Sequence, residues 1–245
     1  MSSIKNICVM TKNELYSYFV SPTVYIFTII FLILMGYFTF MMGEFFEVGE
    51  ANLQQFFLWQ PWLYLLLVPA IGMGMWSEER KTGTIELLFT MPVTMSECII
   101  SKFLAAWIVL GVAISLTFPI IATVFYLGNP DIGPIICGYI GSFLMSGSYL
   151  AVAAFTSALS KSQVVSFIIS VVICLLLVLA GFPPVTSIFA EYSNVIDFVA
   201  SFSFITHFNN LQRGVLDFRD VVFYLSVTVF FLFMTGLNLK NHNAG

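Results

Sequence analysis

Long apolar stretches without charged residues alternate with short polar segments along this chain of 245 residues. A helix needs about 20 apolar residues to cross the hydrocarbon core of a bilayer. Six stretches meet this need, and we predict transmembrane helices over 22–42, 58–76, 102–127, 134–158, 164–182 and 220–239. The alternating pattern of a membrane β-barrel is missing from the sequence, so helices are the form in which the backbone satisfies its hydrogen bonds in lipid. The pattern therefore predicts one all-α polytopic membrane domain over residues 1–245.

The first 20 residues precede these stretches and carry a pattern of their own. Apolar residues recur there at helical spacing, whereas Lys5, Lys12 and Glu14 lie off the apolar stripe. This predicts an amphipathic helix over residues 1–20 that lies in the membrane interface. Pro22 suits the first turn of the crossing that follows. No cleavage site ends that crossing, so we expect it to act as an uncleaved signal-anchor.

A second region outside the apolar stretches, residues 184–219, is too long for a simple connector between two crossings. An approximate apolar stripe predicts one or two short amphipathic helices there, at the outer face and re-entrant at the membrane edge. A cluster of charged residues ends this region, namely Arg213, Asp217, Arg219 and Asp220. The cluster fits either an ion pair that fixes the entry of the last helix or a contact with substrate. His207 suits a hydrogen-bonded residue of this surface better than a ligand.

Lysine and arginine are distributed unevenly between the two sides that six crossings define. With both termini in the cytoplasm, seven of the nine basic residues lie inside and only Arg213 and Arg219 lie outside. The inner set is Lys5, Lys12, Arg80, Lys81, Lys102, Lys161 and Lys240. This bias predicts a multi-pass protein of the bacterial inner membrane with cytoplasmic termini. The net charge of −4 averages two opposite faces, so it identifies no partner.

The densest charge lies in segment 79–97, between the second and third crossings of a chain that is only 9% charged. Gly83 can separate two helical pieces, and Thr84 can cap the second of them. The apolar run Leu87-Leu88-Phe89 lies beside these charges, and a pure topology signal does not need it. Thr94-Met95-Ser96-Glu97 then has the pattern of a capping box that opens the next helix. We predict a folded intracellular surface for a partner, and a solvated loop that only sets topology is the alternative.

The charged segment reads Glu79-Arg80-Lys81-x-Gly83-Thr84-Ile85-Glu86-Leu87-Leu88-x-x-x-Pro92 and is followed by Lys102-Phe103-Leu104. This ordered run resembles the segment after the second crossing in ABC-2 type permeases, the membrane subunits of ABC exporters. The N-terminal run Lys12-Asn13-Glu14-Leu15-Tyr16-Ser17-Tyr18-Phe19-x-Ser21-Pro22 is similar to the lead-in of that family. The run from His207 to Asp220 resembles the approach to the last crossing in its gliding-motility branch.

The resemblance implies a coupling helix in this segment that docks on a separate ABC ATPase subunit. The residues expected to couple to the ATPase are Glu78, Glu79, Arg80, Lys81, Gly83, Thr84, Glu86, Leu87, Leu88 and Phe89. It also implies that the ATPase, and not this chain, binds ATP and Mg. Two permeases, either two copies or two related chains, would assemble with two ATPases. Within the family, the gliding-motility and nitrous-oxide-reductase-maturation branches are the most similar.

Patterns of catalytic or metal-binding chemistry are missing from the sequence. It has no G-x-x-x-x-G-K-[ST] phosphate loop and no zinc-protease motif, and its four cysteines show neither metal nor redox spacing. His207 and His242 are the only histidines, and the predicted topology places them on opposite sides of the membrane. We therefore expect no catalytic residue, metal or cofactor in this chain, and no nucleic-acid partner.

The predicted crossings also lack charged residues at their centres, where ion-coupled carriers commonly place them. This favours a permease whose energy comes from outside the bilayer. We predict the transmembrane subunit of an ATP-driven exporter, not an enzyme by itself. Two alternatives stay open: a carrier or channel that needs no ATPase, and a non-transporting anchor that transmits force to an accessory protein at the outer face.

Overall fold

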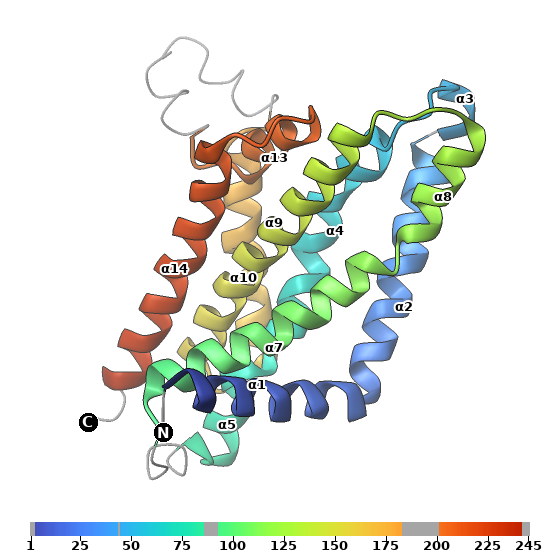
Figure 1. Cartoon of the computed structure of the whole chain (residues 1–245). Coiled ribbons are helices and arrows are strands. Elements are labelled where there is room, and N and C mark those ends of the chain that lie inside the picture. The colour runs from blue at the N-terminus through green and yellow to red at the C-terminus, as the bar shows by residue number, and fades with distance from the viewer. Residues whose placement is uncertain (1–2, 44, 86–92, 183–200, 242–245) are drawn as a thin grey trace.

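The computed structural model describes residues 3–43, 45–85, 93–182 and 201–241, and no strand occurs among them (Figure 1). Five helical segments are long and apolar enough to cross a membrane: Pro22–Met42, Gln54–Thr82, Met95–Leu127, Ile132–Leu159 and Phe218–Lys240. The remaining predicted crossing is a shorter apolar helix, Gln163–Leu179, whose 17 residues rise about 26 Å. These findings confirm the prediction of an all-α polytopic membrane protein.

The long helices form a bundle, and one further helix lies across each end of it: α1 (Ser3–Val20) at one end and α13 (Phe204–Gln212) at the other (Figure 1). In chain order, the helices are α1, α2 (Pro22–Tyr37), the π-helix η1 (Phe38–Met42), α3 (Phe45–Val48), α4 (Gln54–Gly72), α5 (Gly74–Thr82), α7 (Met95–Ser115), α8 (Phe118–Leu127), α9 (Ile132–Leu159), α10 (Gln163–Leu179), α13 and α14 (Phe218–Asn241). Helices α1 and α5 and the last turns of α14 lie at one end, which we call the α1 end (Figure 1). Helices α3 and α13 lie at the other, the α13 end.

The predicted N-terminal helix forms as α1, which lies across the foot of the bundle and packs on α7 (Figure 1). Ser21 ends it and caps α2, because its hydroxyl accepts a hydrogen bond from the N–H of Thr23 at 3.3 Å. Pro22 occupies the first turn of α2, where its missing N–H costs nothing. The position of α1 in a membrane interface stays a prediction.

The helix of the second crossing extends beyond the apolar stretch that predicted it: it spans Gln54–Thr82, against a predicted 58–76. Helix α4 contains Pro61 and Pro69 and ends at Gly72, and α5 continues it to Thr82 after the single residue Met73. The charged residues that follow Trp76 are therefore helical and extend the crossing. The sequence alone places them in a connecting segment.

The third crossing is interrupted, although the sequence predicts one helix over 102–127. Helix α7 begins at Met95 with the predicted capping box: the Thr94 N–H donates to Glu97 Oε2 at 2.8 Å, and the Glu97 N–H donates to the Thr94 hydroxyl. It ends at Ser115, and α8 starts at Phe118. Pro119 explains the interruption, because it has no N–H and its ring would clash with the carbonyl of residue 115 in a continuous helix.

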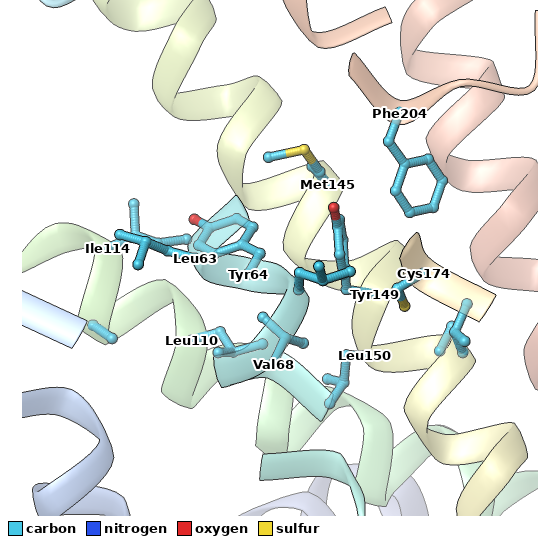
Figure 2. Packing of buried hydrophobic residues seen from close by; sticks show 14 of the residues in the cluster. Leu63, Tyr64, Val68, Leu110, Ile114, Met145, Tyr149, Leu150, Cys174 and Phe204 are labelled. Carbon is cyan, nitrogen blue, oxygen red and sulfur yellow. The ribbon is translucent and has the colours of Figure 1, made fainter. Parts of the chain in front are cut away.

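Helix α9 is the central helix, and it packs against α4, α5, α7, α10, α13 and α14. Small residues on α9 permit this, since a Cβ at Gly138 would lie 2.4 Å from the ring of Phe57. The same holds at Gly147, against the ring of Trp107. Figure 2 shows Tyr149 and Leu150 of α9 surrounded by side chains from α4, α7, α10 and α13. A movement of α9 therefore affects the six helices that pack against it.

Candidate functional site

The exposed tip of α5 lies at the α1 end of the bundle. Gly83 ends the helix in the left-handed region, with φ at +73°, where the sequence predicts the first helical piece to end. Most of the second predicted piece lies outside the described residues. The hydroxyls of Thr82 and Thr84 lie 2.9 Å apart, and Thr82 also donates to the carbonyl of Glu78 at 3.0 Å. Lys81 projects from the same turn and is exposed. The four residues Lys81–Thr84 therefore form a folded, exposed turn, which we call the tip.

A buried lysine lies behind this tip. The Lys102 ammonium contacts Glu79 Oε1 at 2.7 Å and Glu14 Oε1 at 3.1 Å, and only 11% of its side chain is exposed. It also lies 5.5 Å from the centroid of the Trp76 ring, within the range of a cation–π contact. Because these residues come from α1, α5 and α7, the lysine joins three helices. We call Glu14, Glu79 and Lys102 the charged joint.

The charges of the joint do not cancel. Two carboxylates share one ammonium, and Glu79 Oε2 is buried without a hydrogen-bond partner among the described residues. Tyr18 of α1 lies close by; burial raises its pKa to about 12, although Lys102 opposes the shift. Tyr18 is therefore neutral at physiological pH. Removing one partner from a buried charge cluster costs free energy, because it leaves an uncompensated charge. The joint therefore opposes separation of α1, α5 and α7.

Two other charged residues of α5 also bind within the chain. Arg80 donates through Nη1 to the carbonyl of Ala158, at the C-terminal end of α9, where the helix dipole favours a cation. Glu78 Oε2 accepts a hydrogen bond from Gln163 Nε2 of α10 at 3.4 Å. Helix α5 is thus bound to α1, α7, α9 and α10.

The structure divides the predicted ATPase-coupling residues into two groups. Glu79 and Arg80 point into the bundle, whereas Lys81, Gly83 and Thr84 are exposed at the tip. Glu78 is exposed but leans on α10. The remaining predicted residues lie outside the described part of the chain: Glu86, Leu87, Leu88 and Phe89.

The charged joint closes one side of a polar cleft at the α1 end, with a volume of about 710 Å³. Its lining combines apolar residues, among them Phe27 and Ile71, with polar ones such as Glu78 and Gln163. The cleft thus separates the corner between α1 and α2 from α5.

The charged cluster at the α13 end is organised differently from its prediction. Among the described residues neither Arg213 nor Arg219 forms an ion pair, and both are exposed. The buried pair is instead His207 with Asp220, whose Nδ1 and Oδ1 atoms lie 2.5 Å apart. The Asp217 carboxylate accepts a hydrogen bond from the Arg219 N–H at 3.0 Å and so caps α14. A buried hydrogen-bonded pair therefore lies at the entry of the last helix, and the partner of Asp220 in it is His207 and not an arginine.

Contacts on both ring nitrogens and on the ring face fix the orientation of the His207 side chain. Its Nε2 lies 3.0 Å from the carbonyl of Ser201, which can only accept, so Nε2 carries a proton. The ring stacks on Phe223, with centroids 3.9 Å apart. This supports the expectation of a hydrogen-bonded residue. Within the part of the chain that the structure describes, no group of three His, Cys, Asp or Glu side chains is placed to hold a metal.

The sequence profile of the family described as ABC-2 family transporter protein matches residues 9–239. The match contains the charged joint, the tip and the His207–Asp220 pair. This chain belongs to the ABC-2 transporter family. As an ABC-2 protein it is a membrane permease component of an ABC transporter, and the family implies partnership with an ABC ATPase subunit. No curated protein matches the chain significantly.

For an ABC-2 permease, the charged joint is the feature that sequence reasoning missed. The apolar stripe of α1 leaves Glu14 outside it, yet Glu14 faces α7 and binds Lys102. Lys102 itself belongs to the run that carries the family resemblance, which was the one available signal. The spacing of residues along the chain does not show which carboxylates Lys102 contacts, because Glu14 and Glu79 lie on two other helices.

Proposed function

We propose that this permease works with a separate ATPase subunit, which docks on the tip of α5 and on the segment that follows it. ATP binding and hydrolysis by that subunit then drive export, or mechanical work, across the membrane. The observation that carries the proposal is the charged joint, because it fixes α5 to α1 and α7 directly behind the exposed tip. A loop that only sets topology needs no such connection.

The proposal assigns an orientation to the molecule. The α1 end carries the tip and faces the cytoplasm of a bacterial cell, with both termini on that side of the inner membrane. ATP and Mg²⁺ are bound by the ATPase subunit, and this chain contributes the surface on which that subunit docks. The lysine and arginine distribution supports this orientation.

The chain is proposed to act as one half of a permease pair, with either a second copy or a related permease. The outward faces of α2 and α14 are apolar, since Ile29 and Phe233 are more than half exposed. These faces suit lipid or a neighbouring permease. A native mass measurement on the complex extracted with its lipids is expected to show two permeases, and one permease for each complex would refute the pairing.

The second candidate function is a non-transporting anchor that transmits force to an accessory protein at the outer face. This function is supported by the hydrogen bonds that buried polar groups of the bundle form with one another. Gln60 donates to the Tyr64 hydroxyl at 3.1 Å and accepts a hydrogen bond from Ser142. Likewise, Ser148 donates to the carbonyl of Tyr224 at 3.0 Å. These groups are occupied, and none of them lines the cleft at the α1 end. Movement of substrate in sealed vesicles together with ATP hydrolysis would decide for export, and hydrolysis without movement would decide for the anchor.

Copurification tests the docking proposal. Lys81→Glu reverses a charge at the exposed tip and touches no described ion pair, so the fold is expected to survive. We expect it to reduce the amount of ATPase that copurifies with the permease. Glu47→Lys is the matched control, since it reverses an exposed charge on α3 at the opposite end. Equal copurification of ATPase with both variants and with the wild type would contradict docking at the tip.

A further inference from the structure

The junction between α4 and α5 is stabilised by a side chain from another helix. The first four N–H groups of a helix have no partner within it. One of these in α5, the N–H of Trp76, and the next N–H along, that of Ser77, donate to the hydroxyl of Ser157 on α9, at 2.9 and 3.0 Å. The same hydroxyl donates to the carbonyl of Met73 at 2.8 Å. The Ser157 hydroxyl therefore bonds to both sides of the interruption, and the Met73 carbonyl also accepts a hydrogen bond from the Ser77 hydroxyl at 2.5 Å.

This arrangement replaces the usual cap. The residue before α5, Met73, makes no side-chain capping bond, and Ser157 supplies that bond from 80 positions further along the chain. Trp76, Ser77 and Ser157 are fully buried, so water does not reach these groups. Without the Ser157 hydroxyl, the N–H groups would be left unpaired in a dry environment.

The connection of α5 to α9 is stronger than its connection to α4. Arg80 binds the carbonyl of Ala158, the residue after Ser157, so two successive residues of α9 bind α5. Towards α4, α5 is joined through the single residue Met73, which two glycines flank. Gly72 is required for close packing, since a Cβ there would lie 2.5 Å from the Cβ of Ala153. The junction thus combines small residues with a one-residue interruption, in which Met73 keeps helical dihedral angles (φ −59°, ψ −32°) and its N–H donates to the Pro69 carbonyl at 2.8 Å.

We propose that Ser157 is a positioning residue whose hydroxyl caps α5 in trans, so that α5 pivots at Met73 and moves together with α9. The inference rests on the proposed function, in which an ATPase pushes on the tip of α5. Because α9 packs against α4, α7, α10, α13 and α14, movement of α9 carries the push through the bundle to the α13 end. Ser157 thereby adds the central helix α9 to the helices that receive the force through α5.

Three substitutions test this in the complex of full-length permease and ATPase. Ser157→Ala removes the hydroxyl, and Ser157→Thr keeps it. Ser146→Ala is the matched control, because Ser146 is equally buried on α9 but donates only to the carbonyl of Phe143 in its own helix. We expect Ser157→Ala to copurify with the ATPase at the wild-type level. The permease-dependent stimulation of ATP hydrolysis is expected to fall by about fivefold or more, the lower end of common coupling effects between sites. Ser157→Thr should restore it.

Two pairs of spin labels give an independent measurement, with Cys8 replaced because it is the exposed cysteine of the described residues. Labels at positions 81 and 161 report α5 against the turn that follows α9, and labels at 81 and 66 report α5 against α4. Addition of nucleotide should change the second distance and leave the first unchanged, and in Ser157→Ala the first should change as well. Equal stimulation of hydrolysis by Ser157→Ala and Ser146→Ala would overturn the inference while docking stands. Failure of the wild-type permease to bind or stimulate the ATPase would overturn the proposed function itself.

Discussion

Lys102→Met removes the only cation of the charged joint while keeping a side chain of similar length. It leaves Glu14 and Glu79 facing each other across the space between α1 and α5, with one Glu79 oxygen already unpaired among the described residues. Removing one partner of a fully buried charge pair costs about 3–5 kcal/mol. The carboxylates here are 32% and 23% exposed, so solvent lowers the expected loss of unfolding free energy to about 2–3 kcal/mol.

The order of the single variants follows from the same geometry. Glu79→Gln breaks the shorter contact and should cost about 1–2 kcal/mol, and Glu14→Gln, in the more exposed position, less than about 1 kcal/mol. Combining Lys102→Met with Glu79→Gln should recover part of the loss, because the double variant no longer buries an unpaired carboxylate. Tyr18→Phe is the control: Tyr18 borders the joint but is neutral, so its charge balance is unchanged.

Equilibrium unfolding in mixed micelles, followed by tryptophan fluorescence, measures these differences, and the double variant completes a mutant cycle. The cycle gives the interaction between Lys102 and Glu79 separately from the loss of packing. If Lys102→Met is as stable as the wild type, or Glu14→Gln is the most costly change, the joint does not hold the three helices as we describe.

Three further predictions concern the topology, the α13 end and the tip. A single cysteine at position 161 should be labelled only from the cytoplasm and one at 131 only from outside, and outside labelling at 161 would overturn the assigned orientation. His207→Ala leaves the buried Asp220 carboxylate without its partner and should cost about 3 kcal/mol of unfolding free energy; Asp220→Asn in the same background should recover part of it, and no recovery would contradict the pair. Gly83→Ala forces a Cβ into the left-handed region, so it should cost about 1–2 kcal/mol at the tip and lower ATPase copurification, and full binding would show that the turn is not recognised.

Local spacing in the sequence was sufficient for much of the fold. The apolar stretches predicted the bundle, and the boundary at Ser21 and the capping box at Thr94 follow from side chains that bond to residues two or three positions away. The break at Gly83 is equally local, since the left-handed conformation favours glycine. Each of these depends on residues within a single turn or two.

The charged joint and the cap by Ser157 depend on packing between helices, and periodicity alone does not provide this. Hydrophobicity placed Glu14 off the buried stripe, but a buried lysine on α7 makes a carboxylate the favourable residue at that position. The sequence grouped Asp220 with neighbouring charged residues, whereas its partner in the structure is His207 and not a neighbouring arginine. Pro119 marks the interruption between α7 and α8, and the apolar run around it concealed the break.

Site-specific photo-crosslinking from the tip tests the central claim most directly. A photoreactive residue at position 81 lies on the exposed turn, one at 161 lies in the exposed turn between α9 and α10, and one at 47 lies on α3 at the opposite end. In membranes that contain the ATPase subunit, we predict a strong crosslink from 81 to the ATPase and none from 47, with 161 giving a weaker product or none. A crosslink from 161 without one from 81, or copurification of the ATPase with no product from 81, would contradict the account.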